Sequence, residues 1–143
     1  MNEVSYTPII IAISNIISVS IIYLTSQSTA KNVEIKFADT YKCDVFCDVN
    51  MIQTVLKNLI SNAIKYSNYG STIEIIVSDY PQNHSFIQIA IKDYGVGMHP
   101  NEVNKLFRID EKIVSSKGTN QETGTGLGLI LCKEFMDKHN CPI

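Results

Sequence analysis

The segment from Asp48 to Ser67 most constrains the fold, because its apolar and polar residues separate onto opposite faces of a predicted helix. Asp48 is a suitable N-cap, and the turn-forming residues at 68–71 end the pattern. The apolar face carries Val49, Ile52, Leu56, Leu59, Ile60 and Ala63. Such a helix needs a hydrophobic core on one side and leaves its other side for polar contacts.

The polar face of this helix carries Asn58, Asn62 and Lys65. Residues four and seven apart share a helix face, so these side chains point to one place. Carboxamide oxygens are hard ligands that suit Mg²⁺, and a lysine ammonium suits phosphate charge. The pattern therefore predicts a metal and phosphate site, although an ordinary solvated helix face would look the same.

A second polar segment follows the β-rich run that ends near residue 92. Asp93 is followed by Gly95 and Gly97, whose backbone can approach a flat ligand where a Cβ atom would collide. The carboxylate can accept a hydrogen bond from an exocyclic amino group. A tight turn after a strand is the alternative interpretation.

A third segment has glycines at alternate positions, Gly124, Gly126 and Gly128, before an apolar helical pattern. Backbone N–H groups and the helix dipole at such a start can receive phosphate. The segment has neither the Walker lysine pattern nor the Rossmann spacing. A flexible helix entry without a ligand is the alternative.

The N-terminal segment has no charged residue between Glu3 and Lys31. A membrane span needs about 20 mostly apolar residues. The apolar run Pro8–Leu24 is shorter, and it contains Ser14, Asn15, Ser18 and Ser20. We therefore predict a packed helix with Thr7 as N-cap and Pro8 at its first position, with a span over Ile9–Leu24 as the alternative.

The rest of the chain alternates predicted strands and helices. The order predicts an α/β two-layer sandwich in which a sheet has its helices packed on one face, with neighbouring strands joined by short turns and paired antiparallel. The predicted elements are a hairpin of Asn32–Phe37 and Cys43–Cys47, strands Ser71–Ser78 and Ser85–Lys92, a helix His99–Phe107, a loop Arg108–Thr123 and a helix Leu127–Lys138.

Composition narrows the function classes. A chain of 143 residues with a net charge of −2 fits one domain and argues against nucleic-acid binding. The four cysteines form no Cys-x-x-Cys pair, and the three histidines have no metal-site spacing. Reduced thiols in a cytosolic environment are expected.

Taken together, the three polar segments resemble the catalytic and ATP-binding domain of sensor histidine kinases, within the Bergerat-fold ATPases that include DNA gyrase. Asn58–Tyr66 resembles the N box, Asp93–Met98 the G1 box, Leu106–Phe107 the start of the F box, and Gly124–Leu129 the G2 box. The resemblance implies a sandwich with a mixed sheet, and ATP held between the N-box helix and a lid.

The resemblance also implies roles for single residues. Asn62 would be the Mg²⁺ ligand, and Asn58 and Lys65 would lie near the metal and phosphates. Tyr66 would pack on adenine, and Asp93 would accept from its amino group. The G1-box and G2-box residues would leave room for the base and the phosphates. These residues are Gly95, Gly97, Gly124, Thr125, Gly126, Leu127 and Gly128.

Asn58 also bears on the reaction that the resemblance implies. In the gyrase-like branch a glutamate at this place activates water. Asparagine cannot act as that base, so phosphoryl transfer to a protein histidine fits better than hydrolysis.

Departures from the family pattern define the expected domains. The F-box segment has no second phenylalanine, and the residues after His139 lack the usual Gly-Gly turn into final strands. None of the three histidines lies in an acceptor-helix motif. We therefore expect residues 1–31 to be a linker helix from a missing dimerisation module, and 32–143 to be an ATP-binding domain without its C-terminal strands.

The expected function is that of an ATP-dependent protein histidine kinase catalytic domain, inactive without its phosphoacceptor domain. Its expected cofactors are ATP and Mg²⁺, and its partners a histidine-containing dimerisation domain and a response regulator, with no nucleic acid. It would be a cytoplasmic part of a membrane-associated receptor, reaching the membrane only through missing parts. The alternatives are a non-catalytic nucleotide-binding module and a small membrane-anchored interaction protein.

Overall fold

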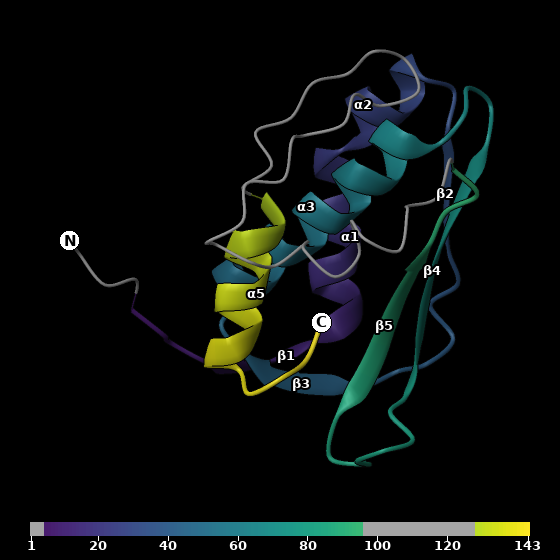
Figure 1. Cartoon of the computed structure of the whole chain (residues 1–143). Coiled ribbons are helices and arrows are strands. Elements are labelled where there is room, and N and C mark those ends of the chain that lie inside the picture. Colours follow the sequence, from purple (N-terminus) through teal and green to yellow (C-terminus); the bar gives the residue numbers. More distant parts are fainter. Residues whose placement is uncertain (1–4, 96–127) are drawn as a thin grey trace.

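The computed structural model describes residues 5–95 and 128–143, which form a layer of helices against a sheet (Figure 1). The elements in chain order are β1 (Ile9–Ala12), α1 (Ile13–Tyr23), α2 (Thr25–Ala30), β2 (Glu34–Phe37), β3 (Asp44–Cys47), α3 (Val49–Tyr66), β4 (Thr72–Asp79), β5 (Ile87–Lys92) and α5 (Gly128–Lys138). The helix predicted at His99–Phe107 and the loop at Arg108–Thr123 lie outside the described residues.

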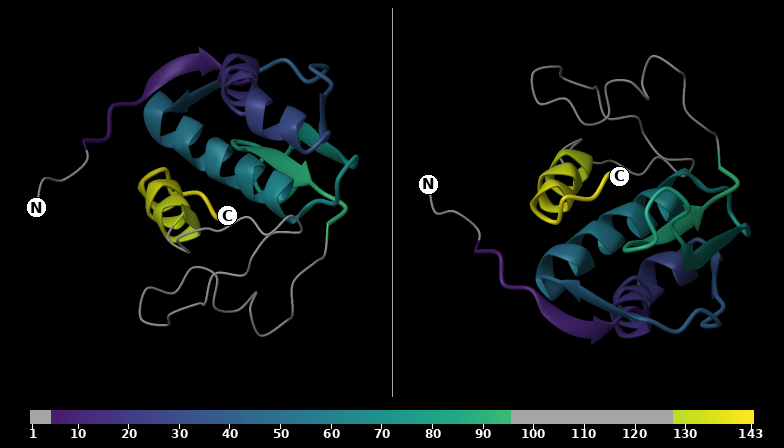
Figure 2. Two further views of the ribbon diagram at one scale, coloured as in Figure 1. Left: turned by 90° about the horizontal axis from the view of Figure 1, so that it is seen from above. Right: turned by 90° about the horizontal axis from the view of Figure 1, so that it is seen from below.

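The main sheet has the strand order β2-β4-β5. β2 pairs parallel to β4, and β4 pairs antiparallel to β5, so the sheet is mixed. Figure 2 shows the helices gathered on one side of it, with α3 packed between α1 and α5. The predicted two-layer α/β sandwich is confirmed.

The predicted hairpin of Asn32–Phe37 and Cys43–Cys47 is wrong. β3 pairs antiparallel with β1, placing Ile10 opposite Phe46, whereas β2 pairs with β4. The chain reaches β4 from β2 through α3, the kind of crossover that a parallel pair requires. Closeness in the sequence therefore misidentified the strand partners.

The first helix begins at Ile13 and not at Thr7 or Pro8. The preceding residues form β1, which suits their β-branched isoleucines. The backbone N–H of Thr7 donates to Asp48 Oδ2 at 2.8 Å, which anchors the start of the chain beside α3. The predicted cap at Thr7 is therefore wrong, and the Thr7 N–H instead binds the residue that caps α3.

The core forms where α1, α3 and β4 meet. Ile16 and Ile17 of α1 are buried in one cluster with Ile60 and Ile64 of α3 and Ile73 of β4. The segment before residue 32 thus packs into the same core as the rest of the domain, and an upstream dimerisation module stays a prediction. Within residues 5–95 and 128–143, no helix is both long enough and apolar enough to cross a membrane.

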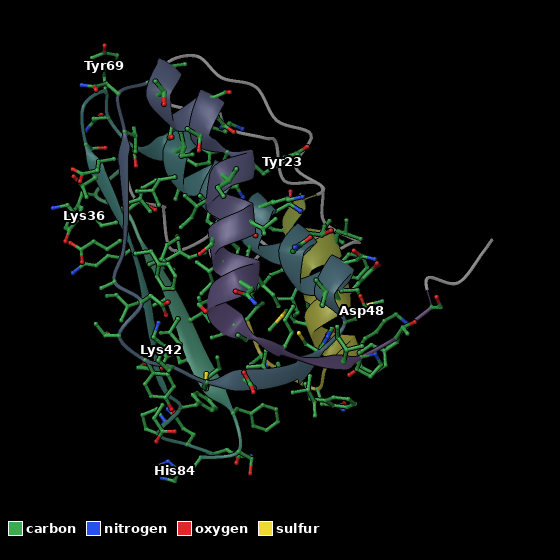
Figure 3. The ribbon with its side chains drawn as sticks, turned by 180° about the vertical axis from the view of Figure 1, so that it is seen from behind. Tyr23, Lys36, Lys42, Asp48, Tyr69 and His84 are labelled. Carbon is green, nitrogen blue, oxygen red and sulfur yellow. The ribbon has the colours of Figure 1, made fainter. Side chains whose placement is uncertain are left out.

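The N-terminus of α3 and the C-terminal end of α5 are joined through Asp48, which Figure 3 labels. Asp48 Oδ1 accepts from the Met51 N–H at 3.1 Å, so the predicted N-cap is confirmed. The Asp48 N–H donates to His139 Nε2 at 3.0 Å, while His139 Nδ1 lies 2.7 Å from the carbonyl oxygen of Phe135. The His139 ring thus lies between the start of α3 and the last turn of α5.

Candidate functional site

The polar face of α3 carries the three predicted side chains, because the opposite face is buried in the core. Asn58 and Asn62 are half-buried, whereas Lys65 is buried. The Lys65 ammonium lies 5.1 Å from the centroid of the Tyr66 ring, a cation–π arrangement. The helix therefore presents two carboxamides, with the ammonium and the aromatic ring near its C-terminal end.

Asn58 faces the start of α5. Its Nδ2 donates to the Thr54 carbonyl oxygen at 3.0 Å, which fixes the carboxamide. A Cβ atom added to Gly128 would lie 2.9 Å from Asn58 Oδ1. Glycine at position 128 therefore lets α5 approach the carboxamide oxygen of Asn58 closely.

Asn62 lies one turn further along α3. Its side chain makes no hydrogen bond with any residue in the described parts of the chain, so its oxygen can accept a ligand. The described residues also hold no group of three or more His, Cys, Asp or Glu side chains placed for a metal ion. A single carboxamide oxygen such as that of Asn62 fits Mg²⁺, which takes few protein oxygens together with phosphate oxygens and water.

Asp93 and Gly95 lie at the C-terminal end of α3. The Gly95 N–H donates to Asp93 Oδ1 at 2.9 Å, and the Asp93 side chain is exposed. A Cβ atom at Gly95 would lie 2.0 Å from the Tyr66 carbonyl oxygen, closer than any real contact. Only glycine lets this backbone rest on the last residue of α3.

The two glycine contacts define the extent of the site. Gly128 meets α3 at Asn58 and Gly95 meets it at Tyr66, eight positions later. At 1.5 Å per residue, these points lie about 12 Å apart along the helix. α3 thus brings the residues after β5 and the start of α5 to one side of the same helix.

Other predicted site residues lie outside the described parts of the chain: Gly97, Gly124, Thr125, Gly126 and Leu127. The F-box residues Leu106 and Phe107 lie outside them as well. The structure therefore brings together seven of the predicted positions: Asn58, Asn62, Lys65, Tyr66, Asp93, Gly95 and Gly128.

Two residues near the site were not found from the sequence. Cys132 of α5 is fully buried, and burial raises the pKa of its thiol to about 11, with a hydrogen bond from the Asn58 side chain partly offsetting the rise. Lys31 is also buried, and its ammonium lies at the C-terminal end of α3. The only sequence signal for Lys31 was its place as the first charge after a long uncharged stretch.

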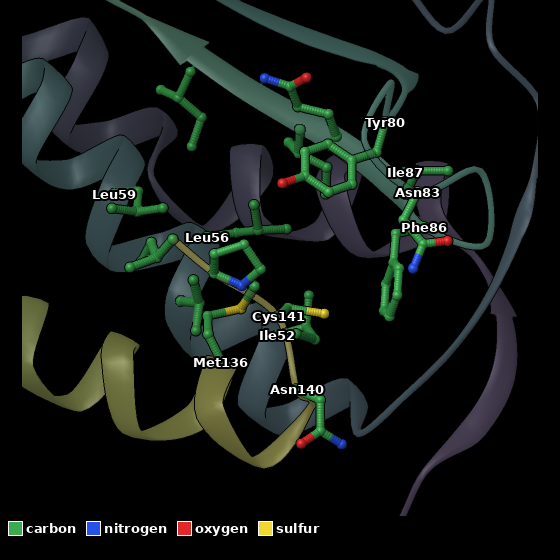
Figure 4. A pocket seen from close by; sticks show the side chains of 16 residues that line it. Ile52, Leu56, Leu59, Tyr80, Asn83, Phe86, Ile87, Met136, Asn140 and Cys141 are labelled. Atoms are coloured by element: carbon green, nitrogen blue, oxygen red, sulfur yellow. The ribbon is translucent and has the colours of Figure 1, made fainter.

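A separate cavity of about 570 Å³ lies on the apolar side of α3 (Figure 4). Its lining includes Ile52 and Leu56 of α3, Ile89 of β5 and Met136 of α5, and none of the predicted site residues. The cavity is therefore distinct from the polar face that carries Asn58 and Asn62.

Comparison with known proteins identifies a family for most of the chain. Residues 47–143 match the family described as histidine kinase-, DNA gyrase B-, and HSP90-like ATPase. The fold is similar to that of a mycobacterial sensor histidine kinase, MprB, with a TM-score of 0.76 at 20% identity over 94% of this chain and 81% of that chain. The catalytic domain of histidine kinase ThkA gives a TM-score of 0.75 at 21% identity, over 94% of this chain and 82% of that one.

Curated relatives share sequence over a similar region. The histidine protein kinase SaeS of Staphylococcus epidermidis is 37% identical over 92 residues, which are 64% of this chain and 26% of that protein. The adaptive-response sensory kinase SasA of Prochlorococcus marinus is 32% identical over 96 residues, 67% of this chain and 24% of that protein. The chain thus spans about a quarter of the length of these relatives.

Proposed function

The chain belongs to the histidine kinase-, DNA gyrase B-, and HSP90-like ATPase family, and on this basis we propose that it is the ATP-binding catalytic domain of a sensor histidine kinase. Its reaction is transfer of the γ-phosphoryl group of ATP to a histidine on a separate dimerisation domain. That phosphohistidine is then the phosphoryl donor for a response regulator. The observation that carries the proposal is the packing of Gly95 and Gly128 against the same polar helix, α3.

The adenine end of the proposed site lies at the C-terminal end of α3. Asp93 is exposed there, and the Gly95 contact with Tyr66 holds its segment against the helix. The Asp93 carboxylate accepts a hydrogen bond from the adenine amino group, whereas guanine presents a carbonyl at the corresponding position. Tyr66 supplies an aromatic surface beside the base.

The phosphate end of the proposed site lies beside Asn58 and Asn62. Asn62 is the proposed Mg²⁺ ligand, because its carboxamide makes no hydrogen bond to the described residues. When bound, Mg²⁺ neutralises the charge of the phosphate oxygens. Asn58 lies here beside Gly128, whereas the Lys65 ammonium lies beside the Tyr66 ring, toward the adenine end.

Phosphoryl transfer fits this site better than hydrolysis. The Asn58 carboxamide is not a general base, and its Nδ2 is already bound to Thr54. Of the histidines, His84 pairs with Asp79, and His139 binds Asp48 and Phe135. Neither lies beside Asn58 or Asn62. His99 lies outside the described residues, and its sequence surroundings show no acceptor-helix motif, so the proposal places the acceptor histidine on another domain.

Calorimetric titration tests the binding half of this proposal. We expect ATP to bind more tightly with Mg²⁺ than without it, and more tightly than GTP in either case. Phosphotransfer is then tested with radiolabelled ATP and a supplied histidine-containing dimerisation domain. Label on that domain supports a kinase, binding without transfer would identify a non-catalytic nucleotide-binding module, and no binding would reject the proposal.

A further inference from the structure

Lys31 is a buried cation that directly follows α2 and caps a different helix. It is 4% exposed, and its Nζ donates to the carbonyl oxygens of Ile64 at 3.0 Å and Lys65 at 2.7 Å. The last carbonyls of a helix lack partners within the helix and form its negative pole. Placing an ammonium there satisfies these carbonyls and compensates the cost of burying the charge.

The backbone of Lys31 is tied to the same region. The Gly70 N–H donates to the Lys31 carbonyl oxygen at 3.2 Å, so the residue also contacts the turn that follows α3. The Asn32 residue next to it has a φ of 54°, which places the chain in the left-handed region as it turns into β2. Lys31 therefore contacts the C-terminal end of α3 with its side chain and the turn after α3 with its backbone.

The proposed adenine end contacts that same turn of α3. Gly95 rests on the Tyr66 carbonyl, the next carbonyl along from the two that Lys31 binds. The Gly95 N–H in turn donates to Asp93 Oδ1 and holds that carboxylate in place. A continuous set of contacts thus runs from Lys31 through the last turn of α3 to Asp93.

We propose that Lys31 is a positioning residue for the adenine end of the nucleotide site. It fixes the last carbonyls of α3, and through Tyr66 and Gly95 it sets the place of the Asp93 carboxylate. Its charge also offsets the negative pole at the C-terminal end of α3. This inference rests on the proposed function, because it assigns a role in nucleotide binding.

A double-mutant cycle on ATP binding tests the proposal. Lys31→Met keeps the length of the side chain and removes its charge and donors, so the dissociation constant for ATP should rise roughly tenfold in the folded protein. Combination with Asp93→Asn should be strongly non-additive, because Lys31 acts through Asp93. Combination with Asn62→Ala, at the phosphate end, should be close to additive.

The matched control is Lys36→Met, which removes the same charge from an exposed position on β2 (Figure 3). Its ATP affinity should stay within about twofold of the unaltered chain, since an exposed side chain away from the site usually contributes little. Circular dichroism verifies folding of each variant. A folded Lys31→Met protein that binds ATP as tightly as the Lys36→Met protein would overturn the proposal.

A nucleotide-free measurement separates this inference from the proposed function. Amide resonances of Tyr66 and Gly95 should shift in Lys31→Met and stay in place in Lys36→Met. If the unaltered chain binds no ATP, the proposed function fails whatever these resonances do. If Lys31→Met does not fold, Lys31→Gln keeps an NH₂ donor group without the charge, and unchanged ATP affinity in that variant refutes the role of Lys31.

Discussion

Asp48 joins three segments, because its carboxylate accepts from the Thr7 and Met51 N–H groups and its backbone N–H donates to His139. The Thr7 N–H, ahead of the Met51 N–H, holds the pKa of this carboxyl below its ordinary value. A folded-state pKa below the unfolded one adds stability above the unfolded value, and this stability is lost as pH falls through the folded value. Asp48 therefore stabilises the domain at neutral pH and less so in acid.

The corresponding prediction is that Asp48→Ala lowers the free energy of unfolding at pH 7 by about 1 kcal/mol or more, through loss of the helix cap. The difference from the unaltered chain should narrow as pH falls below about 4. Urea unfolding at several pH values measures this. Asp39→Ala, at an exposed ion pair with Lys42, is the control and should change stability little.

Gly95 and Gly128 make close contacts of different kinds. A Cβ atom at Gly95 would strike a backbone carbonyl, whereas one at Gly128 would meet the end of the Asn58 side chain. Gly95→Ala should therefore lower ATP affinity by about fivefold or more, because overpacking against backbone costs about 1–3 kcal/mol. Gly128→Ala should cost less, because a side chain can move aside. Equal losses for both in calorimetry would contradict this reasoning.

At the scale of elements, α3 does most to build the site. One face packs against α1 and β4, α5 packs beside it, and the remaining face carries the two carboxamides. The cap at Asp48 and the ammonium of Lys31 hold its two ends. The positions of Asn58 and Asn62 are thus set by a helix that is restrained along its whole length.

Mg²⁺ should raise the affinity for ATP in the unaltered chain, and Asn62→Ala should make this increase roughly tenfold smaller. Loss of a group around a bound metal typically costs about 10- to 100-fold in affinity, and we expect the lower end of this range. The affinity measured with excess chelator should change much less, because the carboxamide acts through the cation. Titration of ATP with and without Mg²⁺ gives both values. Asn50→Ala makes the same chemical change at an exposed position of α3 and should leave both values unaltered. Equal metal dependence in both variants would remove Asn62 as the ligand.

At the scale of the whole molecule, the chain should bind ATP without labelling itself. In-line transfer requires a nucleophile held beside the γ-phosphate, and of the histidines that the structure describes neither His84 nor His139 is placed beside Asn58 or Asn62. His99 lies outside the described residues and has no acceptor-helix motif around it in the sequence. Incubation with radiolabelled ATP should give no acid-labile histidine phosphate on this chain, and label should appear on a dimerisation domain added in trans. Stable label on the chain alone would show that an acceptor is present within it.

The elements that could be predicted from the sequence are those whose contacts join residues close together in the chain. The bounds of α3 and α5, the cap at Asp48 and the β4–β5 pair were predicted, because helix hydrogen bonds and short turns involve residues close in the chain. The N-box, G1-box and G2-box motifs also indicated the family, which the match over residues 47–143 confirms. These features depend on residue type and spacing alone.

Only the tertiary structure decided which strands pair and what surrounds each side chain. β1 was mistaken for helix and β2 for the partner of β3, because a strand takes its hydrogen-bond partner from anywhere in the chain. The burial of Lys31 at the end of α3 likewise depends on two segments more than thirty residues apart. Periodicity determined α3, α5 and the polar face of α3, whereas packing between distant segments determined the shape of the site.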